Sequence, residues 1–184
     1  ALFEAYPQLK ETKIVFYENN SFAEGQTGGF TDFESNVIGA GLLPVQPDNN
    51  RTQSRFGQSG AYDDASLKSL LLHEVQHLIQ QFEGFQRGGN KNEILPYLES
   101  VELKKIKEAG ELEWLDDETK RAVARSRVSD RYNNAQEAYE AISGEVEARN
   151  VQRRSDLTPE QRRQTLAEET EDVSRKDQIF LNEA

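Results

Sequence analysis

The sequence predicts an α+β domain that is mostly helical and carries a small β-sheet near its N-terminus. The N-terminal third holds short β-branched and aromatic runs, separated by glycine-rich and asparagine-rich stretches, which is typical of strands and turns. Beyond it, apolar residues recur every three or four positions over long segments, which indicates amphipathic helices. We expect residues 1–184 to form one domain, with sheet and loops over 1–62, helices over 63–169 and an extended tail over 170–184.

The N-terminal elements follow from β-propensity and turn residues. In chain order we expect a short helix over 1–10, a strand over 13–17, a loop or irregular hairpin over 21–35, a second strand over 36–43 and a long polar loop over 44–62. Gly39 and Gly41 loosen the second strand, since glycine within a strand often marks a bulge or a close backbone approach. An exposed edge of this second strand is our candidate for binding an extended peptide.

The helical part follows from the apolar period and from capping residues. We expect helices over 64–83, 94–109, 117–128 and 131–153. A further helix should begin at Thr158 and Pro159, because proline suits the first helical position and Gln161 completes the spacing of a capping box.

Composition limits the function classes. The net charge of −11 argues against general binding to nucleic acid or to anionic membranes, and no apolar run has the length of a membrane span. The chain has no cysteine, so thiolate ligands and cysteine nucleophiles are excluded. It also has no methionine, from which we expect a segment of a longer polypeptide.

The strongest chemical signal is the sequence His73-Glu74-Val75-Gln76-His77. Residues four apart share one face of a helix, so both imidazoles can point at one metal ion. Glu74, beside the first histidine, is placed to take a proton from a water that the metal activates. These are the only two histidines in the chain, and this pattern predicts a catalytic Zn²⁺ site.

A catalytic zinc needs a third protein ligand, and without further histidine or cysteine that ligand must be a carboxylate. The best donors lie in the predicted helix over 131–153. Glu145 continues an apolar stripe through Ala138 and Ile142, whereas Glu147 falls on a more polar face. We therefore predict Glu145 as the third ligand and keep Glu147 as the fallback.

Other candidate residues carry weaker signals. Tyr132, Tyr139 and Arg149 lie on the predicted ligand helix and could contact a substrate or a developing oxyanion. Packing is the commoner role for such tyrosines. Arg149 belongs to a cluster of arginines whose simplest role is pairing with nearby acids: Arg149, Arg153, Arg154, Arg162 and Arg163.

Several segments together resemble one of the large polyvalent protein-associated domains of phages and mobile elements. The segments are 71–80 (LLHEVQHLIQ), 83–85 (EGF), 87–89 (RGG), 144–154 (GEVEARNVQRR), 169–173 (ETEDV) and 177–179 (DQI). The two longest segments are specific, and the N-terminal third matches less well. The likeness extends over most of the chain.

This resemblance implies a zincin-like metallopeptidase fold whose metal is bound by two histidines and a glutamate. It also implies a domain excised from a large phage or mobile-element polyprotein, carried in the virion or released into the host cytoplasm with mobile DNA. We expect a zinc metallopeptidase that hydrolyses peptide bonds of a protein or peptide substrate. The alternative is a catalytically inactive zincin-like module that binds a partner or serves a structural role.

Overall fold

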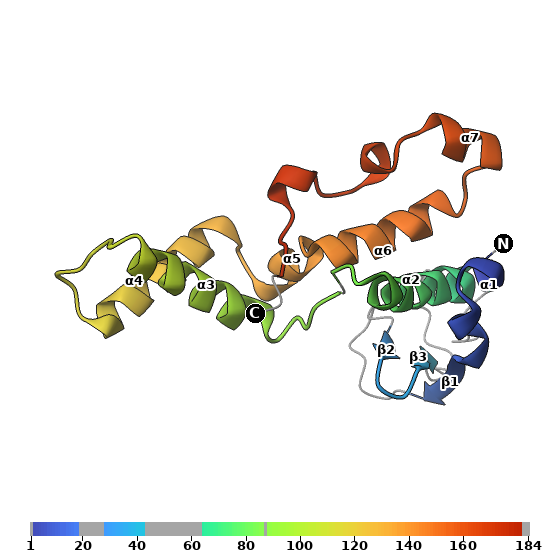
Figure 1. Cartoon of the computed structure of the whole chain (residues 1–184), viewed down its shortest axis with the longest axis horizontal. Coiled ribbons are helices and arrows are strands. Elements are labelled where there is room, and N and C mark those ends of the chain that lie inside the picture. The colour runs from blue at the N-terminus through green and yellow to red at the C-terminus, as the bar shows by residue number, and fades with distance from the viewer. Residues whose placement is uncertain (1, 19–27, 43–63, 87, 182–184) are drawn as a thin grey trace, which may run out of the picture. The chain divides into compact units, whose positions relative to one another are not determined.

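The computed structural model describes residues 2–18, 28–42, 64–86 and 88–181. Over these residues the chain is mostly helical and has one three-stranded sheet near its N-terminus, which confirms the predicted α+β fold class (Figure 1). The chain forms two compact units. The first unit combines Ala1–Arg87 with Glu147–Asp172, and the second combines Gly88–Val146 with Val173–Ala184.

The first unit contains the sheet. Its strands are β1 (Lys13–Glu18), β2 (Gly29–Asp32) and β3 (Val37–Leu42), in the order β1-β3-β2. β3 pairs parallel with β1 and antiparallel with β2. The prediction of a free edge over 36–43 was wrong, because β3 is the central strand. β2 lies within the stretch predicted as loop or irregular hairpin, and the predicted loop over 44–62 lies outside the described residues.

The predicted N-terminal helix is interrupted. It consists of α1 (Leu2–Ala5) and a short 3-10 helix, η1 (Pro7–Glu11). Tyr6 between them has φ −126° and ψ 75°, because the proline ring disfavours helical backbone in the residue before it.

Helix α2 (Asp64–Glu83) covers the sheet and has the bounds that the apolar period predicted (Figure 1). Leu78 of α2 packs with Leu9 and Ile38, and each of the three side chains is buried. Gly84 follows with φ +68°, a left-handed conformation that glycine adopts readily and that commonly ends a helix. This packing fixes how α2 is turned about its own axis.

The second unit is helical. Helices α3 (Ile94–Glu108) and α4 (Asp117–Arg131) run antiparallel, and α5 (Ala135–Glu140) follows them (Figure 1). Asp116 and Asn134 cap the second and third of these helices by accepting main-chain N–H bonds. The unit has a core of buried residues comprising Ile94, Val128, Tyr132, Ala138, Ala141, Ile142 and Ile179.

The single helix predicted over 131–153 was wrong. The structure has α5 and then α6 (Ser143–Arg154), with a break at residues 141–142. The break coincides with main-chain pairing to the C-terminal segment: Ile179 N–H donates to Ala141 (2.7 Å), and Ser143 N–H donates to Ile179 (2.9 Å). Part of this segment therefore packs into the second unit, as a short parallel bridge between Ile142 and Ile179.

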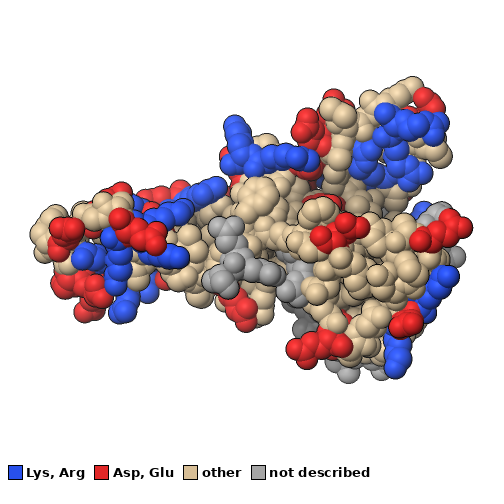
Figure 2. All heavy atoms as spheres, viewed as in Figure 1, with Lys and Arg blue, Asp and Glu red and all other residues tan. Residues whose placement is uncertain are grey.

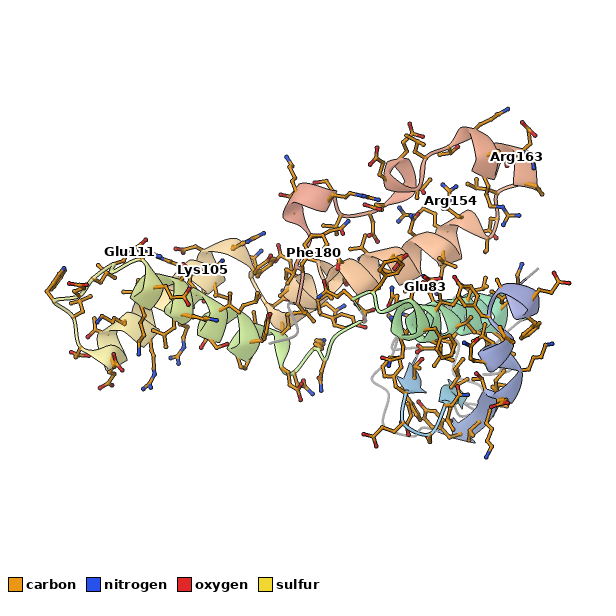
Figure 3. The ribbon with its side chains drawn as sticks, viewed as in Figure 1. Glu83, Lys105, Glu111, Arg154, Arg163 and Phe180 are labelled. Carbon is orange, nitrogen blue, oxygen red and sulfur yellow. The ribbon has the colours of Figure 1, made fainter. Side chains whose placement is uncertain are left out.

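Beyond α6 the chain returns along the first unit through α7 (Pro159–Gln164) and the 3-10 turn η2 (Ala167–Thr170). Thr158 and Gln161 form the predicted capping box. Arg154 of α6, labelled in Figure 3, stabilises this segment: its guanidinium donates to main-chain oxygens of Arg162, Thr165 and Leu166. A further 3-10 turn, η3 (Arg175–Asp177), follows in the second unit. Across the described residues, no helix combines the length and apolarity that crossing a membrane requires.

Candidate metal centre

The two histidines lie together on one face of α2. Their spacing of four residues places the rings one turn apart, in an edge-to-face arrangement with ring centroids 4.7 Å apart. The Nε2 atoms of His73 and His77 face each other at 3.1 Å. Two imidazole nitrogens on one tetrahedral zinc ion stand about 3.3 Å apart, given Zn–N bonds of about 2.0–2.1 Å. The observed separation fits a shared metal ion.

A glutamine amide lies against the other ring nitrogen of each histidine. Gln152 Oε1 is 3.2 Å from His73 Nδ1, and Gln80 Oε1 is 2.9 Å from His77 Nδ1. An amide oxygen can only accept, so both Nδ1 atoms carry the proton and both lone pairs lie on Nε2. Two lone pairs at this distance repel each other unless a cation lies between them, and the arrangement therefore favours a metal ion.

Glu145 completes a group of three donors. One ligand atom from each of His73, His77 and Glu145 lies within 4.8 Å of the others. Glu145 stands in the first turn of α6 and is only 2% exposed, and its Oε1 accepts the Gly89 N–H at 3.2 Å. Two imidazole nitrogens and one carboxylate oxygen are a donor set that zinc takes in catalytic sites.

α6 approaches α2 through polar contacts of its later residues, all within the first unit. Gln152 donates to the main-chain oxygen of Ser69 at 3.0 Å, and Gln80 donates to Glu147 at 2.7 Å. Since α6 is one continuous helix, these contacts also set how its first turn is rotated. Helical phase within α6 buries Glu145 and exposes Glu147, the order that the sequence suggested.

Glu74, the predicted general base, points toward the sheet. A residue one position after a ligand is turned about 100° round the helix, so its side chain leaves the histidine face. The Thr31 hydroxyl of β2 lies 2.9 Å from the Glu74 carboxylate and 3.1 Å from the Glu74 main-chain oxygen. The backbone of Gly29 passes so close that a Cβ there would stand 2.5 Å from Glu74 Oε1. β2 therefore confines the carboxylate of Glu74, which is 5% exposed.

The weaker candidates have other surroundings in the structure. Tyr132 is buried in the core of the second unit, where burial raises the pKa of its hydroxyl, and Tyr139 packs against the same core. The Arg149 guanidinium donates two hydrogen bonds to the Asp172 carboxylate, at 2.7 and 3.0 Å. Burial favours the neutral acid at Asp172, but bonding to Arg149 and the charges of Arg149 and Arg153 outweigh it and lower the pKa. Arg149 thus pairs with an acid, the simpler of the two roles considered for it.

Sequence reasoning missed Gln80, Gln152 and Thr31. Gln80 could have been found, since it lies three residues after His77 and so shares a helix face with it. Gln152 comes from another helix and Thr31 from a strand hidden in a predicted loop, so no local pattern links either residue to the histidines.

Comparison with known proteins found no relative of this chain. The chain was compared with protein-family models, with curated proteins and with solved structures, and nothing matched. The function must therefore be argued from the chemistry of the site.

Proposed function

We propose that this chain is a zinc-dependent metallopeptidase domain that hydrolyses peptide bonds. The observation that carries the proposal is the paired orientation of His73 and His77, with both Nε2 atoms facing each other and both Nδ1 atoms against amide oxygens. Two imidazole lone pairs that face each other in a largely buried place cost free energy unless a cation lies between them, so the arrangement favours a bound metal ion. The proposal agrees with the resemblance to zincin-like domains of large phage or mobile-element polyproteins.

His73, His77 and Glu145 would hold the ion. When bound, zinc lowers the pKa of a water molecule toward neutrality and polarises a peptide carbonyl as a Lewis acid. With the ion in place, Glu74 would serve as the general base that accepts a proton from the attacking water and passes it to the leaving amine. Thr31 donates to the Glu74 carboxylate and restricts its rotamers, so that the base is held in one orientation before substrate arrives.

The sheet suggests where a peptide substrate would lie. β2 carries both Gly29 and Thr31 against Glu74, and it pairs only with β3 among the strands that the structure describes. A peptide that added to the outer edge of β2 would form main-chain hydrogen bonds and bring its backbone beside Glu74. We place substrate at this edge instead of at the predicted strand over 36–43.

Two measurements test the function. Elemental analysis of the purified chain should give one zinc per molecule. Incubation with a peptide library should give cleavage that Glu74→Gln lowers by about 10²–10⁴-fold while zinc content stays unchanged, because the amide cannot accept the proton. A chain without bound metal contradicts the proposal. A zinc-loaded chain that cleaves nothing would instead be the non-catalytic zincin-like module.

A further inference from the structure

We infer that Glu147 is a positioning residue which, acting through Gln80, fixes His77 in the form that can bind metal. The inference rests on the proposed zinc site and gives Glu147 a role other than that of a ligand. Three groups form a chain of hydrogen bonds. Glu147 accepts from Gln80 Nε2 at 2.7 Å, and Gln80 Oε1 accepts from His77 Nδ1 at 2.9 Å.

The direction of this chain follows from what each group can do. A carboxylate has no proton to donate, so Glu147 can be satisfied only by the NH₂ end of Gln80. The oxygen end of Gln80 must then face His77, and an oxygen there requires the proton on Nδ1. The lone pair of His77 is thereby left on Nε2, the atom that faces His73. The charge on Glu147 thus selects both the amide orientation and the imidazole tautomer.

Burial makes this selection effective. Gln80 is 0% exposed and His77 is 7% exposed, so exchange with bulk water cannot readily replace either bond. In such surroundings hydrogen bonds polarise one another, and the ionised end makes the bond between Gln80 and His77 stronger than a neutral partner would. Glu147 itself is exposed on α6, so the hydrogen-bond chain runs from the surface of the helix to the buried imidazole.

The hydrogen bonds around His73 provide a comparison within the same site. Gln152 donates to the Ser69 main-chain oxygen at 3.0 Å and presents its Oε1 to His73 Nδ1 at 3.2 Å. The geometry is the same, but the groups that orient the amide are neutral: the Ser69 carbonyl and the Ser69 hydroxyl, which accepts at 3.2 Å. A main-chain carbonyl also accepts only, so the same tautomer results on both histidines. The hydrogen bonds at His77 differ because the group that orients the Gln80 amide is the carboxylate of a side chain.

Exchanging the carboxylate and the amide between positions 147 and 80 tests the inference. Glu147→Gln should weaken zinc binding about 10-fold to 100-fold, the usual cost of losing an outer hydrogen-bond partner, because an amide at 147 no longer forces Gln80 to present its oxygen. Adding Gln80→Glu to that variant should recover most of the affinity. The new carboxylate at position 80 accepts directly from His77 Nδ1, and the amide at 147 donates to it.

The affinity is measured by chelator competition, with Glu160→Gln as the charge control. Glu160 is an exposed glutamate of α7 that contacts Arg163 and Gln164, so its loss should leave zinc affinity unchanged. Circular dichroism checks the fold of each variant. The inference is wrong if Glu147→Gln binds zinc like the wild type, or if the double variant binds as weakly as the single one. It is also wrong if Glu147→Gln loses zinc as completely as Glu145→Ala, because Glu147 would then be a direct ligand.

A second measurement needs no metal. In ¹⁵N-labelled metal-free protein, NMR of the imidazole nitrogens should place a proton on His77 Nδ1 in the wild type and in Glu160→Gln. In Glu147→Gln a mixture of tautomers should appear. An unchanged tautomer in Glu147→Gln overturns the inference. Because this result is obtained even if the wild-type chain binds no zinc, failure of the inference and failure of the proposed function are told apart.

Discussion

Two helix pairs in this molecule are held together in opposite ways. α2 and α6 meet through polar side chains, with Gln80 buried and bonded to Glu147, and Gln152 bonded to Ser69 and His73. α3 and α4 bury an apolar set and keep their charges outside: the buried residues are Ile94, Ile106, Ala124 and Val128. Figure 2 shows acidic and basic side chains intermixed over the surface of the α3–α4 pair.

The ion pairs of α3 and α4 are of the ordinary surface kind. Arg127 contacts Glu102 at 2.9 Å and Glu111 at 2.7 Å, and Lys107 contacts Asp117 at 3.0 Å; the Glu102 side chain is 23% exposed and the others are more exposed. Glu111, which is labelled in Figure 3, lies in the segment that joins α3 to α4. Pairs of this kind contribute little to stability, because solvent screens the charges and holding two long side chains together costs entropy. The apolar pair is therefore organised for stability, whereas the polar pair bears a desolvation cost that a bound metal would offset.

The largest effect should come from the histidines themselves. His77→Ala removes one of three ligands and leaves the Gln80 oxygen without its donor. Zinc affinity should fall by more than about 100-fold, which exceeds the cost of losing an outer hydrogen bond. Chelator competition measures it, and His73→Ala should behave alike. Stoichiometric zinc in either variant would remove the metal-site proposal, and with it the reason for the polar helix pair.

The apolar pair should respond in the opposite way. Ile106 is 0% exposed, so Ile106→Ala should lower the free energy of unfolding by about 2–5 kcal/mol through lost burial and an unfilled cavity. Zinc affinity should not change, because α3 and α4 supply none of the three candidate ligands. Urea unfolding followed by circular dichroism gives the first quantity, and chelator competition the second. A loss of zinc in a folded Ile106→Ala variant would contradict this division of roles.

The contact between β2 and Glu74 should affect turnover and leave binding of the metal unchanged. Thr31→Val keeps the shape of the side chain but removes the hydroxyl, which should lower kcat about tenfold, equivalent to about 1.4 kcal/mol for a hydrogen bond to a charged group. Thr31→Ser should restore the rate because it restores the donor. Equal rates in Thr31→Val and wild type, on whichever library peptide is cleaved, would show that the hydroxyl does not position the base.

The contrast between the helix pairs also explains what the sequence could predict. α2 was predicted with its bounds because its apolar period, its histidine spacing and Gly84 are all local signals. The pairing of His73 with His77 follows from helix geometry alone. Burial of Glu145 was anticipated from a phase carried through Ala138 and Ile142, although the helix is broken at residues 141–142. Their positions within α6 alone predict the same difference in burial, because Glu145 and Glu147 are separated by about 200° around the helix axis.

The features that escaped prediction depend on residues far apart in the sequence. The break between α5 and α6 involves main-chain pairing with Ile179, more than thirty residues downstream. β2 is only four residues long, and its pairing with β3 decides its conformation. The glutamines of the polar pair lie on different helices, and only the packing of α2 against α6 brings Gln152 to His73. Apolar periodicity carries no information about such polar contacts.

The smallest expected effect concerns an ion pair on α6, the helix that also carries the candidate ligand. The Arg149–Asp172 pair is partly buried and bidentate, so Asp172→Asn should lower the free energy of unfolding by about 0.5–1 kcal/mol at neutral pH. The pKa of Asp172 is lowered in the folded state, so its contribution is full above the unfolded pKa of about 3.9 and is lost as pH falls through the folded pKa. The difference between wild type and Asp172→Asn should therefore be constant from about pH 5 to 8 and vanish in stronger acid. Urea unfolding at a series of pH values measures it, and Arg149→Ala, alone and combined, isolates the pair. A difference that persists well below the folded pKa would mean that Asp172 stabilises α6 by packing and not by its charge.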